Sequence, residues 1–248
     1  MSRQETYSYG QGAVYLAPRL PNGEAGAFRW VGDVSELSIS LNVEDFTHKE
    51  SYSGQRQEVR KIITGKSGEV SIKFHELSSE NLSLMLLGEM SKTNAGEVTG
   101  EALPKEIKVG DRIALAHQNV SKVKIATLTE NTDFVVNSVF GTIEFLTEHS
   151  NFTKTVSYAH NEVENVAILN SNPQDLFLRF EGINLAEQNE WNLVELYKIN
   201  FNPTDALSLI NNENSLDGLN SKAKVLADTT KVGDSNLGRF GRVVKIKQ

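Results

Sequence analysis

The strongest constraint on the fold of this chain is a two-residue alternation of apolar and polar side chains. From Leu37 to Val43 every second residue is apolar, and the residues between them are polar. The apolar set is Leu37, Ile39, Leu41 and Val43, and the polar set is Ser38, Ser40 and Asn42. Since successive side chains of a strand point to opposite faces of a sheet, this pattern predicts a half-buried antiparallel strand.

The same alternation returns in later segments. The repeats are Val70, Ile72 and Phe74, and then Leu176, Leu178 and Phe180. Both faces are apolar over residues 191–201, which predicts a strand that is covered on both sides. Turn sequences rich in Gly, Pro, Asn and Asp separate the strand candidates. Many short strands with such turns predict a mainly β fold, an antiparallel β-sandwich or barrel.

One flanking α-helix is predicted over about residues 78–87. Ser78 is a good N-cap residue, and Leu77 and Leu82 have the spacing of a hydrophobic staple around it. Gly88 suits the C′ position, where the backbone often turns left-handed. Since apolar residues occupy more than one side of this helix, we expect it to lie against the sandwich or against a neighbouring subunit.

Two long polar stretches interrupt the strand pattern. We expect a single domain over 1–248, with a long charged loop or arm at 44–61 and a candidate mobile loop at 88–105. Irregular stretches of this length in a compact domain are usually functional or disordered. The chain is long enough to bury a substantial core on its own.

Charge and cysteine content exclude several classes of protein. The formal net charge is −7 and there is no cysteine, which argues against a conventional nucleic-acid binder and excludes disulfides and thiolate metal sites. Seven Lys and Arg against two Asp give residues 221–248 a charge of +5. This basic tail is either a solvated edge strand with protective lysines or an element that pairs with an acidic neighbouring subunit. The polar N-terminus and the lack of a long apolar run predict no secretory signal and no membrane partner.

No catalytic, cofactor-binding or metal-binding residue is predicted. Gly65-Lys66-Ser67 lacks the upstream glycine of a phosphate-binding loop, because position 60 is Arg60. None of the five histidines lies in a metal-binding motif, and no Gly-x-Ser-x-Gly nucleophile motif occurs. The acidic stretch 211–218 lacks the order of a calcium loop. We therefore expect no cofactor and no enzymatic activity.

Several segments resemble siphophage-type major tail tube proteins, which form long non-contractile tails. The most specific segment runs from the strand Val34–Val43 into a charged stretch that ends at Arg56. Weaker similarities lie at 131–136, 140–143, 178–184 and 225–229, whereas residues 7–10 do not match. The resemblance implies a tail tube fold with one flanking helix, in hexameric rings that stack into the tail of the virion.

The resemblance also implies partners and a location. The partners are further copies of the chain, other tail proteins such as the tape measure and the tail terminator, and double-stranded DNA, which passes transiently and without specificity through the lumen. The protein would be made in the host cytoplasm. An acidic wall repels phosphates within about 10 Å at 0.1 M salt, which suits passage of DNA without base recognition.

The arm is the candidate site for contacts between subunits or rings. Its mixed charges are poorly suited to a monomer core and well suited to a polar contact with a neighbour. Arg56 is a candidate bidentate partner for a carboxylate. The alternative interpretation is a solvated loop. The candidate contact residues are His48, Lys49, Glu50, Ser51, Tyr52, Ser53, Gly54, Gln55, Arg56, Arg60 and Lys61.

Two other functions remain open. A β-sandwich module that binds carbohydrate or a receptor would need an exposed aromatic platform, and Trp30 and Trp191 are the two tryptophans. A tube component of a contractile secretion or bacteriocin system would have the same fold as a tail tube protein.

Overall fold

The computed structural model describes residues 7–187, 190–212, 218–231 and 237–247. Its fold is mainly β with antiparallel sheets and, in the described ranges, one α-helix. The predicted fold class is therefore confirmed. No helix in the described part of the chain has the length and apolar character needed to cross a lipid bilayer.

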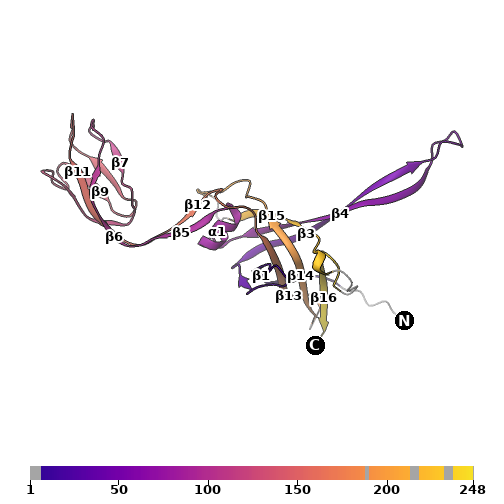
Figure 1. Ribbon diagram of the computed structural model, residues 1–248. Coiled ribbons are helices and arrows are strands. Elements are labelled where there is room, and N and C mark those ends of the chain that lie inside the picture. Colours follow the sequence, from indigo (N-terminus) through magenta and orange to yellow (C-terminus); the bar gives the residue numbers. More distant parts are fainter. Residues whose placement is uncertain (1–6, 188–189, 213–217, 232–236, 248) are drawn as a thin grey trace. The chain divides into compact units, whose positions relative to one another are not determined.

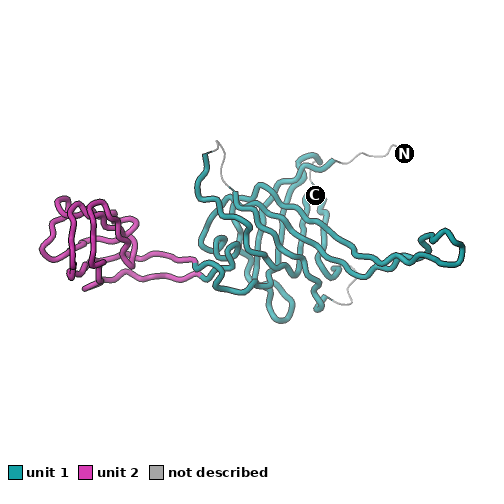
Figure 2. Tube along the Cα trace, turned by 90° about the horizontal axis from the view of Figure 1, so that it is seen from above, with its two compact units in different colours: residues 1–89, 167–248 teal, residues 90–166 magenta. Residues whose placement is uncertain are grey.

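The chain forms two compact units rather than the expected single domain (Figure 2). Unit 1 comprises residues 1–89 and 167–248, and unit 2 comprises residues 90–166. Each unit has its own hydrophobic cluster. Periodicity could not separate the units, because strands of both alternate in the same way. Unit 2 is inserted into the sequence of unit 1.

Unit 1 contains one eight-stranded sheet (Figure 1). Its order is β2-β1-β13-β14-β15-β4-β3, and β16 also pairs with β14. The strands are β1 (Gly10–Pro18), β2 (Arg29–Trp30), β3 (Val34–Lys49), β4 (Glu58–Phe74), β13 (Asp175–Asn184), β14 (Glu190–Phe201), β15 (Leu219–Val225) and β16 (Gly241–Lys247).

The sheet of unit 1 folds around its core because β14 changes partner along one edge. Residues 190–196 of β14 pair with β16, and residues 199–201 pair with β15. Side chains from β1, β4, β13, β14 and β15 then meet in one buried cluster. Phe74 and Phe201 pack there with ring centroids 6.3 Å apart, so the core lies between strands that are distant in sequence.

The helix α1 (Ser79–Met85) closes this core. Its N-cap is Ser78 as predicted, with the Ser78 side chain accepting a hydrogen bond from the backbone N–H of Asn81. The Asn81 amide donates to the carbonyl oxygen of Val31 at 2.8 Å. At the other end Leu87 has a φ of 44° and occupies the C′ position. The prediction that Gly88 fills that position is therefore wrong. Gly88 is the next residue, and its N–H donates a hydrogen bond to the carbonyl oxygen of Ser83.

Unit 2 contains two three-stranded antiparallel sheets, β7-β10-β9 and β6-β11-β8. Their strands are β6 (Gly96–Ala102), β7 (Arg112–Ala114), β8 (Val120–Ile125), β9 (Phe134–Asn137), β10 (Thr142–Phe145) and β11 (Thr155–His160). The core includes Phe134, Ile143, Phe145 and Val156.

A two-stranded sheet carries the chain into unit 2 and back. It consists of β5 (Glu89–Thr93) and β12 (Val163–Ala167). The prediction of a mobile loop over 88–105 is therefore wrong, since β5 and β6 both lie within that range. The polar composition misled the prediction because most side chains of β5 face solvent.

Candidate assembly site

Strands β3 and β4 continue well beyond the sheet as a two-stranded ribbon (Figure 1). The two strands pair from Val34 to Lys49 on β3, whereas β15 pairs with β4 only over residues 68–74. We call residues 42–67 the distal ribbon; in the described structure its two strands pair only with each other. The prediction of an irregular stretch over 44–61 is therefore wrong for all but residues 50–57. Both faces of the ribbon are in solvent, so neither face needs apolar residues, and the sequence lacks the alternation that would predict a strand.

The distal ribbon leaves large apolar side chains in solvent. Phe46 is 58% exposed, Ile63 is 55% exposed and Ile62 is 45% exposed. Phe46 and Ile62 are directly opposite each other in the register. Because an isolated two-stranded hairpin is at best marginally stable in water, a partner that covered these side chains would stabilise the distal ribbon.

The tip of the ribbon is built around the buried carboxylate of Glu50. One Glu50 oxygen, Oε2, accepts the backbone N–H groups of Tyr52 and Ser53, each at 2.8 Å. The other, Oε1, accepts the Ser53 hydroxyl and, at 3.2 Å, the backbone N–H of Gln57. The Ser53 hydroxyl and these N–H groups lower the pKa of Glu50 to about 2. Glu50 therefore holds the tip together, and its carboxylate faces inward.

The outer residues of the tip are free to meet a partner. Tyr52 is 87% exposed, and Ser51, Gln55 and Arg56 are exposed as well. Arg56 makes no ion pair with any residue that the structure describes, and its backbone has a φ of 51°. Gly54 also lies in the left-handed region, with a φ of 77°. The turn of the tip thus uses two left-handed residues, and Arg56 is exposed with no ion-pair partner among the described residues.

The remaining predicted contact residues lie along the ribbon behind the tip. Lys49 pairs with Glu58 at 3.6 Å, and Lys61 pairs with Asp45 at 3.1 Å. His48 lies opposite Arg60 in the register. The structure thus brings all the predicted residues onto one hairpin. It assigns Glu50 to the inside of the tip and gives Lys49 and Lys61 partners within the ribbon.

An apolar groove at the base of the ribbon was missed by the sequence analysis. It has a volume of about 470 Å³ and lies between β3 on one side and β14 and β16 on the other. Leu41 and Val243, two of its lining residues, are 79% and 65% exposed. The alternation of apolar residues in β3 could have indicated this groove. It continues to Leu41 and Val43, although the buried core on the partner strand β4 ends at Val70, which lies opposite Ile39.

The last part of the basic tail forms the edge strand β16, which has acidic partners within its own chain. Arg242 pairs with Glu195 at 2.6 Å, and Lys245 pairs with Glu190 at 3.1 Å. Both carboxylates belong to β14 and are buried. Lys222 and Lys231 of the tail pair with Glu69 and Glu24 as well. The tail thus contributes the edge strand β16 and part of the internal strand β15, and four of its cations have carboxylate partners within the subunit. Its removal would also take away a strand that pairs along its whole length with β14.

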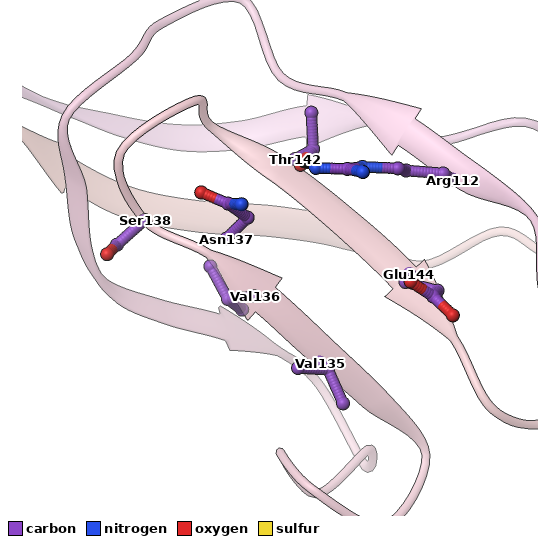
Figure 3. Close-up of a pocket in the computed structure, with 7 residues that line it drawn as sticks. All are labelled: Arg112, Val135, Val136, Asn137, Ser138, Thr142 and Glu144. Carbon is purple, nitrogen blue, oxygen red and sulfur yellow. Dashed lines mark hydrogen bonds between the residues drawn. The ribbon is translucent and has the colours of Figure 1, made fainter.

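A hollow of about 380 Å³ lies on the β7-β10-β9 sheet of unit 2 and is lined mainly by polar residues (Figure 3). Arg112 donates from Nε and Nη2 to the Thr142 hydroxyl at 3.1 and 3.0 Å. Ser138 and Glu144 lie at opposite ends of the hollow. The described residues contain no group of three His, Asp or Glu side chains suited to a metal ion.

Comparison with known proteins places the chain in one family. The chain belongs to the family described as "Protein of unknown function UCP028589", which matches residues 7–244. This match spans both compact units. No curated protein matches the chain.

Proposed function

We propose that this member of the UCP028589 family is a structural protein that assembles with copies of itself, as the tube subunit of a long phage tail. The observation that carries the proposal is the distal ribbon, which exposes apolar side chains. At its tip Arg56 is exposed and forms no ion pair with the residues that the structure describes. In a monomer these apolar side chains stay in water and add no stability. A neighbouring subunit that covered them would bury apolar surface, which favours association. No residue is assigned a catalytic role.

The geometry favours a head-to-tail contact between copies. In such a contact the distal ribbon of one copy would bind a different surface of the next copy, and every copy would carry both surfaces. Such heterologous contacts produce closed rings when the rotation closes, and open helical filaments when it does not. Rings that stack are one outcome of this rule, and they are the assembly that the tail tube resemblance implies.

Two free sheet edges support the same proposal. In the described structure β3 pairs only with β4, and β16 pairs only with β14. An unpaired edge is a hazard for a soluble monomer, and pairing with an edge of the next copy removes it. Lys247 on β16, and Glu36 and Glu44 on β3, have opposite charges that suit such a contact.

The other parts of the proposal rest on the family resemblance. They are the hexameric rings, the acidic lumen that conducts DNA, the tape measure and tail terminator partners, and the location in the virion tail. The net charge of −7 agrees with a lumen that repels DNA.

The proposal is tested by sedimentation velocity and negative-stain microscopy over a range of protein concentrations. We expect rings or tubes, and we expect a variant with residues 45–61 replaced by a two-residue turn to stay monomeric and folded. A wild-type chain that remains monomeric at high concentration would contradict the proposal, as would tubes formed by the shortened variant.

A carbohydrate- or receptor-binding module is the second candidate. It is favoured by the exposure of Trp30 and Trp191, which are 57% and 43% exposed. Binding of a stable monomer to a glycan array would support it. A tube component of a contractile secretion or bacteriocin system shares the proposed assembly, and sheath or secretion genes beside its gene would distinguish it.

A further inference from the structure

The apolar groove at the base of the ribbon lies where the sheet of unit 1 lacks a strand. Strand β15 pairs with β4 on one side and with β14 on the other, and it ends at Val225. Beyond this point β16 continues beside β14, whereas β4 runs out into the distal ribbon (Figure 1). Residues of β4 and β16 line the groove, together with Val225 itself. Each of these two strands has an edge there with no partner strand among the described residues.

The inner part of the groove is continuous with the hydrophobic core. Leu196 and Val225 belong to the core cluster of unit 1, and Phe240 packs against that cluster. Leu41 and Val243 line the outer part and are largely exposed. An apolar side chain that entered between them would join the core of unit 1, and its burial would favour binding.

The distal ribbon of the same copy cannot fill the groove. Leu41 lines the groove, and Phe46 of the distal ribbon follows on the same strand. The five steps from Leu41 to Phe46 span about 17 Å in an extended strand. Phe46 therefore cannot fold back onto Leu41 while β3 stays paired with β4, and a ribbon that fills the groove belongs to another copy.

The distal ribbon has surface chemistry that complements the groove. Phe46 and Ile62 lie opposite each other and are about half exposed. Lys66 lines the groove, and Glu44 lies two residues before Phe46 on the same face of β3. Both charged side chains are exposed, and neither forms an ion pair with a residue that the structure describes. The two surfaces therefore match in apolar character and carry opposite unpaired charges.

We propose that the apolar groove of one copy binds the face of the distal ribbon that carries Phe46 and Ile62 in the next copy. The unpaired strand edges beside the groove then bond to the backbone of the incoming ribbon, as in β-strand addition. Because the two surfaces differ and every copy carries both, the contact repeats head to tail. This inference rests on the proposed assembly and names the surface that covers the ribbon in it.

Cross-linking between two single-cysteine variants tests this contact, since the natural chain has no cysteine. Ser67→Cys places a thiol in the lining of the groove. His48→Cys places one on the distal ribbon, on the same face of β3 as Phe46. Both positions are exposed, and neither change removes an apolar side chain of the contact. Assembled protein is treated with a short bismaleimide, and we expect cross-linked dimers from a mixture of the two variants and none from either variant alone.

Each other pattern of cross-links would overturn the proposal. Dimers from His48→Cys alone would show that ribbons bind each other, and dimers from Ser67→Cys alone would show that grooves bind each other. Assembled mixtures without cross-linked dimers would show that another surface covers the ribbon, and the proposed assembly would still stand. Light scattering of the same samples separates this result from a failure to assemble, which would contradict the proposed function as well.

A charge placed in the groove provides a second test that needs no cross-linker. Val243→Asp changes a side chain that is 65% exposed in the monomer, so the subunit should stay folded by circular dichroism. We expect the concentration needed for assembly to rise at least about tenfold in light scattering. Val139→Asp in unit 2, where the side chain is 67% exposed, is the matched control and should assemble as the wild type. An unchanged threshold in Val243→Asp would overturn the proposal.

Discussion

The two halves of the β3–β4 pair have the same hydrogen-bonding pattern and opposite environments. Near the sheet, Val70 and Ile72 of β4 are buried, because β15 and the core lie beside them. In the distal ribbon, Ile62 and Ile63 of the same strand are about half exposed. The backbone ladder thus continues where the core does not. The β3–β4 pair therefore extends beyond the core of its own subunit, and the distal ribbon is exposed to another molecule.

Loss of a side chain from the buried half should have the largest effect on stability. Phe74→Ala removes a fully buried ring that packs against Phe201, and we expect it to lower the free energy of unfolding by about 3–5 kcal/mol. Urea unfolding followed by tryptophan fluorescence reports on unit 1, since Trp30 and Trp191 both belong to it. The control Ile62→Ala, in the exposed half, should cost less than about 0.5 kcal/mol. Equal costs would remove the distinction between the halves.

Loss of apolar side chains from the distal half should instead affect assembly. Phe46→Ser combined with Ile62→Ser removes two side chains, each of which stabilises a contact by about 1.5–3 kcal/mol when buried. Together they contribute at least about 3 kcal/mol, so we expect the concentration needed for assembly to rise at least about a hundredfold in light scattering. The matched control is Val139→Ser with Phe140→Ser, a pair in unit 2 that is even more exposed. An unchanged threshold in the ribbon variant would show that this face stays in solvent.

Charge reversal at the tip should have a smaller effect on the same threshold. Arg56 is exposed and forms no ion pair with the described residues, so Arg56→Glu should leave the monomer folded. A charge-assisted hydrogen bond contributes about 1.5–3 kcal/mol, which corresponds to about a ten- to hundredfold rise in the threshold. Arg56→Lys keeps the charge and should be intermediate, because it loses bidentate geometry. Normal tubes from Arg56→Glu would show that Arg56 has no acidic partner.

Acid should loosen the tip before it affects the buried half. The pKa of Glu50 falls from 4.5 to about 2 on folding, so its ionised form stabilises the tip fully above pH 4.5. This contribution is lost as the pH falls from 4.5 toward about 2. Hydrogen exchange of the Tyr52 and Ser53 amides should accelerate over that range, and Glu50→Gln should show fast exchange already at pH 7. Glu58→Gln, a neighbouring exposed carboxylate, is the control, and equal behaviour of the two variants would contradict the role of Glu50.

The sequence predicted what depends on local pattern. The alternation around Leu37 and Val70 identified strands, and Ser78 identified the start of the helix, because N-cap chemistry is local. The ribbon and unit 2 were not predicted, because both depend on which strands pair with each other. The two-residue alternation of side chains identifies strands but does not identify their partners. A polar stretch such as 44–61 has the composition of a loop even when every second N–H is bonded across a ladder.

For the candidate site, the sequence selected residues that the structure places on one hairpin, and it did not foresee the internal role of Glu50. Residues 48–56 are indeed the tip and end of the ribbon, but Glu50 is used internally. The Glu50 carboxylate, the Ser53 hydroxyl and the turn at Gly54 form a local motif that composition alone does not show. The apolar groove could not be assigned, because it needs β3 and β16 to be brought together from opposite ends of the chain.

The central claim is that a second copy covers the distal ribbon, and a single-cysteine labelling experiment tests it most directly. The natural chain has no cysteine, so Ile63→Cys provides one reactive thiol in the exposed half. With a maleimide reagent, the thiol should react rapidly in dilute monomer and at least tenfold more slowly in assembled protein. Val139→Cys in unit 2 controls for reagent access to the assembly. Equal reactivity of Ile63→Cys in monomer and assembly would contradict the account.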